Sequence, residues 1–223
     1  MTIRSQQGDG GGAHDEDPLG TVKIYGDKVT ESDITVKAKV FDGIDKFEPM
    51  DDIGNPIFRD DNANNLAGTN EADILHGGRG NDTISANDGH DFVFGGGGRD
   101  TLNGGDGDDW VEGGGSNDVM IGGAGNDSLV ADRGRDLMTG GADEDVFIFK
   151  DAIRSATITD FEDGVDLIDL SRMAAVDCFG DVEITQTAGN MVELSFDNDA
   201  GGTTRVDVIS ASNFTLDEDD FLF

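Results

Sequence analysis

Apolar residues recur at every ninth position through the middle third of the chain. From Gly68 to Ile148 the sequence divides without an insertion into nine units of nine residues, beginning GTNEADILH and GGRGNDTIS. A degenerate tenth unit precedes them, with Asn64 and Leu66 in its two key positions. The eighth position of each regular unit is apolar: Leu75, Ile84, Val93, Leu102, Val111, Met120, Leu129, Met138 and Phe147. A fixed period of this kind indicates a solenoid, because each unit buries its apolar face only by stacking on its neighbours.

The period predicts the geometry of the solenoid. We expect three residues of each unit to form a short strand and six to form a turn, so that two units complete one coil. The strands then stack in two parallel sheets, and position eight points inward from both. The predicted fold class is all-β: a parallel β-roll, which is a two-sheet solenoid, flanked by β-rich N- and C-terminal segments.

The flanking residues suggest three further segments. Residues 1–18 are polar, Gly-rich and acidic, which is typical of a disordered tail. Residues 19–61 contain alternating apolar positions such as Val22 and Ile24, which predict a small β-rich segment before the roll of residues 62–148. Residues 149–223 contain four strand-like runs: Ala156 to Phe161, Val182 to Gln186, Met191 to Phe196 and Arg205 to Ile209.

A polar column accompanies the apolar one. Position six is aspartate in all nine units: Asp73, Asp82, Asp91, Asp100, Asp109, Asp118, Asp127, Asp136 and Asp145. Glycine dominates positions one, two and four: Gly77, Gly78, Gly80, Gly95, Gly96, Gly98, Gly104, Gly105, Gly107, Gly113, Gly114, Gly122, Gly123 and Gly125. Turn backbones there need positive φ or close approach, which glycine allows. Calcium takes six to eight hard oxygen ligands, and these carboxylates and turn carbonyls supply them.

The repeat resembles the G-G-x-G-x-D-x-U-x nonapeptide of RTX, or hemolysin-type, calcium-binding proteins, a known pattern that we identify here by recognition. The resemblance implies a β-roll that folds only when calcium fills its turns, with the aspartates and glycine carbonyls as ligands. The alternative is a disordered Gly-Asp linker. A linker gives no reason for an apolar residue at every ninth position.

Charge supports the same interpretation. The chain has 15 Lys and Arg against 48 Asp and Glu, a formal net charge of -33. Within the nine units, 4 Arg stand against 17 Asp and Glu, a balance of 4 − 17 = −13. Alternate units share an edge, so five turns and four turns leave four and three gaps, or about seven calcium ions with a charge of about +14. Such an acidic chain is not expected to bind nucleic acid or anionic membranes.

Several units depart from the pattern and predict weaker sites. Glu71, Ser116 and Asp143 replace glycine at position four, while Ala86-Asn87 and Ala131-Asp132 replace Gly-Gly. The first and last units are expected to act as caps, as terminal repeats do. Two acidic stretches after the repeats, DFEDGVDLID from Asp160 and DNDAGG from Asp197, fail the EF-hand spacing and are interpreted as turns.

One outer sheet face is predicted to be apolar. Its outward positions include Ile74, Phe92, Phe94, Trp110, Val130, Val146 and Ile148. An apolar strip of this length is not left in water without cause. We favour cover by a flanking segment of the same chain. The alternative is an interface for a protein or glycan partner, or for a second copy.

The C-terminal segment carries a second resemblance. Residues Ile158 to Ser171 resemble the stretch that follows the repeats in serralysin-type secreted peptidases, and the ending FTLDEDDFLF resembles substrates of type I secretion. The resemblance implies export by type I secretion machinery and an extracellular location. It agrees with an N-terminus that has no apolar h-region and with the lack of a membrane-spanning run in the sequence.

The sequence favours a non-catalytic protein. It has no H-E-x-x-H, and its three histidines (His14, His76 and His90) cannot form one; it also has no G-x-S-x-G. His76 and His90 fall at surface positions of the repeat. The alternative is a secreted enzyme acting on acidic polysaccharide, or an accessory module of one, with a site that no motif identifies.

Overall fold

The computed structural model describes residues 61–223 except 151, 198–200 and 213. The segments expected at residues 1–18 and 19–60 lie outside the described residues. Those that are described belong to one compact unit, Glu48–Phe223. Among them, helical structure consists of two short 3-10 turns, η2 (Phe179–Asp181) and η3 (Glu218–Asp220). In this part of the chain, no helix has the length and apolar character needed to cross a bilayer.

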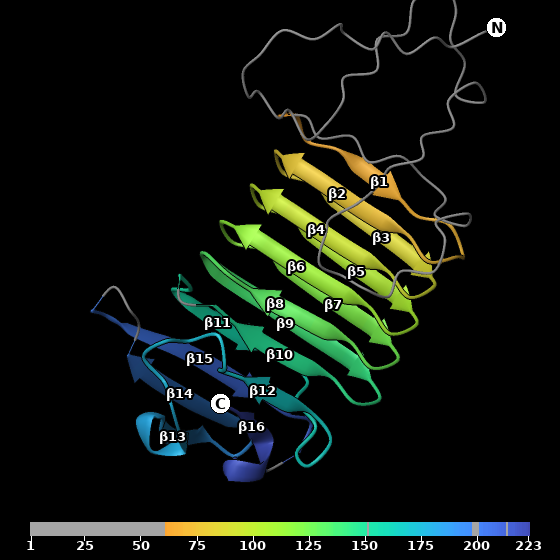
Figure 1. Ribbon diagram of the computed structural model, residues 1–223. Coiled ribbons are helices and arrows are strands. Elements are labelled where there is room, and N and C mark those ends of the chain that lie inside the picture. The colour runs from red at the N-terminus through yellow and green to blue at the C-terminus, as the bar shows by residue number, and fades with distance from the viewer. Residues whose placement is uncertain (1–60, 151, 198–200, 213) are drawn as a thin grey trace, which may run out of the picture. The chain divides into compact units, whose positions relative to one another are not determined.

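Two sheets of stacked strands form the body of the roll (Figure 1). The 7-stranded sheet consists, in spatial order, of β16 (Phe221–Leu222), β12 (Leu167–Asp169), β10 (Val146–Phe149), β8 (Ser128–Ala131), β6 (Trp110–Gly115), β4 (Phe92–Gly97) and β2 (Ile74–Arg79). The 9-stranded sheet consists of β1 (Asn65–Ala67), β3 (Thr83–Asp88), β5 (Thr101–Asp106), β7 (Val119–Ala124), β9 (Arg135–Ala142), β11 (Ser155–Ile158), β15 (Thr203–Ile209), β14 (Met191–Asp197) and β13 (Glu183–Ala188).

The register confirms the predicted coil. Every repeat strand pairs in parallel with the strand two units later, so that Leu75 lies beside Val93 and Ile84 beside Leu102. The position-eight side chains are 0–5% exposed in all nine units and form one continuous core. The prediction of a parallel β-roll with a shared apolar column is therefore confirmed. The degenerate tenth unit is also present, since Leu66 pairs with Ile84.

The strands are longer than the sequence suggested. Most contain six residues, positions seven to nine of one unit and positions one to three of the next, where three had been expected. The reason is that positions one to three, which are mostly glycine, keep the parallel register of positions seven to nine before them. Gly78, for example, lies beside Gly96. The turn proper is therefore short, and it holds the position-six carboxylate.

Positions two and four have a left-handed backbone in most units. Gly96 has φ 101° and Gly98 has φ 138°, and the non-glycine replacements Asn87, Ser116 and Asp143 also have positive φ. A side chain at Gly98 would overlap the carbonyl oxygen of Gly80, one coil away. Glycine is needed here both for conformation and for the close approach of adjacent coils.

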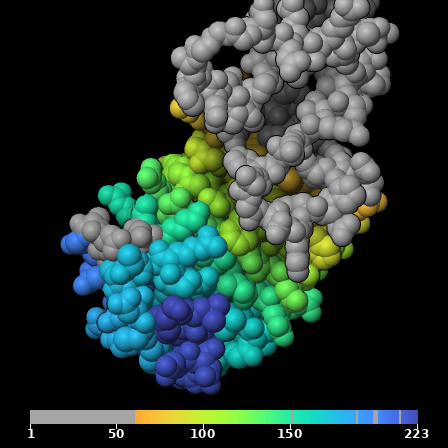
Figure 2. All heavy atoms as spheres, in the orientation of Figure 1, coloured from red at the N-terminus to blue at the C-terminus, as the bar shows by residue number. Residues whose placement is uncertain are grey.

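The residues after the repeats extend both sheets. Strand β11 pairs with β9, and β12 pairs with β10. The predicted strand-like runs of this segment correspond to β11, β13, β14 and β15. The last residues, dark blue in Figure 2, lie among the cyan residues of the preceding segment, where the Phe221 and Phe179 ring centroids are 5.5 Å apart. Strand β16 therefore completes the core at this end.

The predicted apolar face is half-buried to buried throughout. Val130 and Ile148 are almost fully buried, and Arg172 from the C-terminal segment lies over the Trp110 ring, 5.4 Å from its centroid. Lys150 also pairs with Glu112 at 2.7 Å. The chain's own C-terminal segment thus contacts this face at Trp110 and Glu112. Cover of the rest of the face by the same chain remains a prediction. In the described residues, the large apolar side chains that remain exposed lie elsewhere: Leu137, Val165, Leu222 and Phe223.

Adjacent glycines of one unit provide a test of this backbone geometry. We expect Gly98→Ala to lower the unfolding free energy of the calcium-loaded chain by about 1–3 kcal/mol, because the methyl group meets a backbone carbonyl and φ is positive. Gly97→Ala is the matched control, since its methyl group has no atom within 4 Å, and should change the free energy by less than about 0.5 kcal/mol. Equal effects of the two substitutions in urea unfolding would contradict the assignment.

Candidate metal centre

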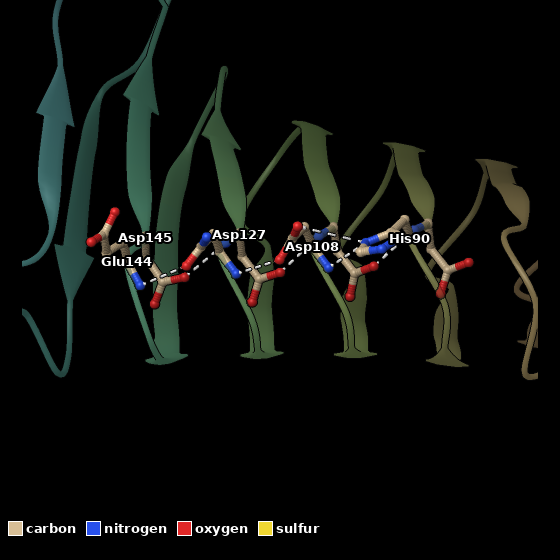
Figure 3. Close-up of polar contacts among 8 residues, drawn as sticks. His90, Asp108, Asp127, Glu144 and Asp145 are labelled. Atoms are coloured by element: carbon tan, nitrogen blue, oxygen red, sulfur yellow. Dashed lines mark hydrogen bonds and ion pairs between the residues drawn. The ribbon is translucent and has the colours of Figure 1, made fainter. Parts of the chain in front are cut away.

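The nine repeat aspartates form two buried columns along the edges of the roll. Each is 1–4% exposed. In eight of the nine, all except Asp73, one carboxylate oxygen accepts the backbone N–H of the equivalent residue one coil earlier, at 2.7–3.0 Å, as in Asp73 N–H to Asp91 Oδ1. Figure 3 shows this arrangement for the column that contains Asp127 and Asp145. The hydrogen bond fixes each carboxylate in the turn and leaves its other oxygen facing the next coil.

The remaining carboxylate oxygens have no protein partner. In the described residues, eight buried oxygens lack a hydrogen bond: Oδ1 of Asp73 and Oδ2 of Asp82, Asp91, Asp100, Asp109, Asp118, Asp127 and Asp136. A buried carboxylate without a partner is strongly unfavourable, and each unsatisfied polar atom in a native structure requires an explanation. A regular series of eight requires a common one, and a bound cation beside each oxygen supplies it.

Backbone carbonyls complete the surroundings of these oxygens. An atom placed as Cβ on Gly95 would lie 2.5 Å from Asp100 Oδ2 and 2.7 Å from the carbonyl oxygen of Gly113 in the next coil. The equivalent position on Gly77, Gly104 or Gly122 also meets its unit's Oδ2 and a carbonyl one coil later. Position one is therefore glycine because a side chain would fill a space lined by two kinds of hard oxygen, and calcium prefers such ligands.

The predicted glycines fall into two groups. The cradle beside the carboxylate is formed by the position-one glycines Gly77, Gly95, Gly104, Gly113 and Gly122. At positions two and four, carbonyls of one coil face a glycine of the next, as Gly78 O faces Gly96 and Gly80 O faces Gly98. Their assignment as calcium ligands remains a prediction.

Carboxylates alone cannot form these sites. In the part of the chain that the structure describes, no three His, Cys, Asp or Glu side chains converge on one point. A cation in a repeat turn would therefore depend on backbone carbonyls for most of its ligands. This donor set suits calcium better than a metal that needs nitrogen or sulfur ligands.

Burial raises the pKa values of the seven repeat aspartates from Asp91 to Asp145. It is the main cause at Asp127, where the charges of Asp109 and Asp145 add to it and the pKa rises to about 8, although a backbone hydrogen bond opposes the shift. Burial likewise raises the pKa of Asp136 and Asp145 to about 7, and that of Asp109 and Asp118 to about 6. The pKa values of Asp91 and Asp100 also lie above normal. Without a cation, the columns therefore resist full ionisation at neutral pH.

A second ladder lies at position five, which sequence reasoning did not identify. The side chains of Asn81, His90, Asp108, Asn117 and Asn126 each accept the position-five N–H of the next coil, at 2.8–3.1 Å. Figure 3 shows the part that runs from His90 through Asp108 to Glu144. The shared feature is a side-chain acceptor, which explains why asparagine, aspartate and histidine interchange there. His90 lies at the surface, as expected.

Two aspartates beyond the repeats end one column. Asp166 accepts N–H groups of Asp145 and Glu162 on its two oxygens, and Asp160 accepts those of Gly140 and Gly141. Interpreting the stretch from Asp160 only as a turn was therefore incomplete. It caps the roll with carboxylates whose oxygens are both satisfied by amides. The spacing from Asp145 to Asp166 is 21 residues, not 18, so a search by period misses it.

The first regular unit caps the same edge at its other end. Asp73 Oδ2 accepts from the backbone N–H and the hydroxyl of Thr69, at 2.6 and 3.0 Å. On the opposite edge, the Asn64 N–H donates to Asp82 Oδ1 at 2.7 Å, which places the degenerate unit in the column. The predicted capping role of the first unit agrees with these contacts.

The raised pKa values predict how pH acts on the roll. Between the ordinary value of 3.8 and about 8, the folded metal-free chain binds more protons than the unfolded chain, so its stability falls as pH rises. Above about pH 5 the unfolded chain and the calcium-filled chain are both ionised, so only the folded metal-free chain holds the extra protons. Metal-free protein should therefore retain more β signal at about pH 5.5 than at about pH 8, and the calcium concentration at half-folding should not decrease as pH rises. Circular dichroism at both pH values measures this, and an equal metal-free β signal at the two pH values, or a midpoint that falls as pH rises, would contradict it.

Comparison with known proteins identifies the repeat. The model of the RTX calcium-binding nonapeptide repeat matches in 4 copies, at residues 60–93, 67–102, 94–129 and 121–149. No curated protein matches the chain.

Solved structures with some similarity include the AlgE6R3 subunit of the Azotobacter vinelandii mannuronan C5-epimerase, with TM-score 0.43 and 24% identity over 73% of this chain and 79% of that one. Another is the extracellular lipase LipA from Serratia marcescens, with TM-score 0.32 and 16% identity over 70% of this chain and 39% of that one. The repeat match identifies residues 60–149 as RTX calcium-binding nonapeptide repeats.

Proposed function

We propose that this RTX-type chain is a secreted, non-catalytic calcium-binding protein whose roll folds when it meets calcium outside the cell. The observation that supports it most directly is the series of eight buried carboxylate oxygens without a protein partner, placed beside carbonyl-lined turns. The aspartates that hold them are 1–4% exposed and so cannot reach a substrate. Their arrangement suits ion binding and structural support more than catalysis.

The columns favour about seven calcium ions. Five turns on one edge enclose four gaps, and four turns on the other enclose three, if one ion occupies each gap. Seven of the eight unpartnered oxygens belong to aspartates followed by another repeat turn on their own edge. The eighth belongs to Asp136, which ends its column. Seven ions would carry about +14 against the −13 of the repeats.

Calcium binding and folding would be one event. Neighbouring carboxylates of a column are separated by about one strand spacing, roughly 4.8 Å, and like charges this close oppose folding. An ion in each gap replaces that repulsion with attraction to both coils. Binding only to the folded chain then stabilises it by mass action.

Two of the irregular units support unequal sites. Ala86 and Ala131 occupy position one, where the other units have glycine, and both are fully buried. Each therefore brings a methyl group to the position that forms the carbonyl-lined cradle elsewhere. We propose that the sites of Asp91 and Asp136 bind calcium more weakly than those of Asp100 and Asp109.

Secretion fits the coupling between calcium binding and folding. Phe221 in the secretion-like ending is buried and β16 pairs with β12, so the folded core sequesters part of the ending. Recognition of that ending by an export machinery would have to precede folding. Extracellular modules bind calcium with dissociation constants on the order of 10⁻⁴–10⁻³ M, so such a chain stays unfolded in calcium-poor cytosol. The type I route rests on the resemblance of FTLDEDDFLF to known substrates.

Calcium titration of metal-stripped protein tests the proposal. We expect a cooperative gain of β signal in circular dichroism, and a change in Trp110 fluorescence as Arg172 docks on its ring. Calorimetry should give about seven ions per chain. Magnesium should fail, because it demands near-octahedral geometry and dehydrates reluctantly. A fully folded metal-free chain that ignores calcium would overturn the proposal.

Substitutions at two adjacent aspartates distinguish the loss of a calcium ligand from the loss of a surface charge. Asp109→Asn removes the charge beside an unpartnered buried oxygen and should raise the calcium concentration at half-folding about tenfold. Asp108→Asn removes the same charge from an exposed side chain whose Oδ1 accepts the Asn126 N–H, and asparagine retains that acceptor. Its midpoint should shift less than about twofold. Equal shifts would show that overall charge, not the turn site, controls folding.

A further inference from the structure

Positive charge gathers at one place on this acidic molecule. The described residues contain eight Lys and Arg, and three of them, Arg135, Arg154 and Arg205, line a single open hollow of about 750 Å³. Among the described residues of its lining, Asp207 is the only acidic one. The charge balance of the hollow is therefore opposite to that of the chain as a whole, which carries -33.

The 9-stranded sheet brings these arginines together from distant parts of the sequence. Strands β9, β11, β15 and β14 lie in that order (Figure 1). Arg135 and Arg205 both pair with Ser155, one from each side, and Ser195 follows Arg205 in the same row. Two strand spacings put the Arg135 and Arg205 backbones about 10 Å apart. Long side chains at that separation can both reach an anion held above Ser155.

The row faces outward from the sheet. Arg135 and Arg205 are exposed and Ser155 is half-buried, whereas the alternating neighbours Ala156 and Val206 are buried in the core. The hollow therefore lies on the outer face, away from the apolar interior between the sheets. An occupant would not disturb the packing that holds the roll together.

Two of the three guanidinium groups have no carboxylate partner. Arg205 Nε lies 3.3 Å from Glu193 Oε1, and its side chain remains 62% exposed. Within the described residues, neither Arg135 nor Arg154 forms an ion pair. In a chain with 48 Asp and Glu, two adjacent unpaired arginines are available for an external anion. Guanidinium groups suit planar or tetrahedral oxyanions, which they bind through paired hydrogen bonds.

The rest of the lining is polar. Ser155, Thr157, Ser195 and Thr203 contribute hydroxyl groups, and among the described residues of the lining Ala156 is the one apolar residue. Hydroxyls can donate to an anion and can also bond to hydroxyl groups of a ligand. The lining surface is more polar than apolar and so suits a polar ligand better than an apolar one. The lining thus favours a small, strongly polar, negatively charged group on a ligand that carries further hydroxyls.

We propose that Arg135, Arg154 and Arg205 form a binding site for the carboxylate or sulfate group of a hydroxyl-rich ligand, such as an acidic saccharide. Arg135 belongs to the eighth repeat unit, whereas Arg154 and Arg205 follow the repeats. The site is complete only when the C-terminal strands have added to the roll. Anion binding would thus report on the folded, calcium-loaded protein, although the site takes no calcium itself.

The test uses the calcium-loaded full chain and three probes at fixed ionic strength: dextran sulfate, uncharged dextran of equal length, and sodium sulfate. We expect calorimetry to detect binding of dextran sulfate and none of dextran. The double variant R135Q/R154Q should weaken dextran sulfate binding at least about tenfold, since it removes two charged donors. Arg99→Gln is the control for a single charge, because Arg99 is exposed and lies outside the hollow, and it should change binding less than about twofold.

Several outcomes would overturn the proposal. They are no binding of dextran sulfate to the folded chain, equal binding by the double variant, and an equal loss in the Arg99→Gln variant, which would indicate a diffuse charge effect. Sodium sulfate that binds as tightly as dextran sulfate would show that a free anion suffices and would overturn the hydroxyl-rich ligand. Calcium-induced circular dichroism of each variant confirms that it folds. Because folding is measured separately, failure of anion binding leaves the proposed calcium-dependent folding intact.

Discussion

The whole roll depends on the second oxygen of each repeat aspartate. In seven of the nine, one oxygen is held by a backbone amide of the preceding coil, as Asp109 Oδ1 accepts the Asp91 N–H, and the other is buried without a protein donor. Burying that charge is unfavourable unless a cation shares the gap. Coil spacing, the choice of glycine at position one and the raised pKa values all follow from this single requirement.

The same requirement explains how the roll begins and ends. Where the calcium-binding pattern stops, side-chain and backbone donors replace the cation: Thr69 at one end of an edge, and the amides bound by Asp160 and Asp166 at the other. The C-terminal strands then continue both sheets with ordinary apolar packing. The repeat solenoid is thereby joined to a segment whose core contains side chains such as Phe161, Phe196 and Phe214.

Continuity between the repeats and the C-terminal strands also creates surfaces that neither part has alone. Arg172 reaches Trp110 on one outer face, and Arg135 shares a row with Arg205 on the other. These contacts join residues from the repeats to residues beyond them. If the roll folds on binding calcium, as proposed, these contacts and the proposed anion site form in the same event.

The sequence by itself determined the two-sheet roll, its inward column and its buried aspartates, because a strict nine-residue period allows one stacking arrangement. It could not determine strand length. Positions one to three are mostly glycine, so no alternation of apolar and polar side chains shows that they pair with the neighbouring strands. Asp160, Asp166 and the arginine row depend on a register that departs from the period after Phe149. Only the tertiary structure decides these contacts, because they join residues whose separation in the sequence follows no repeat.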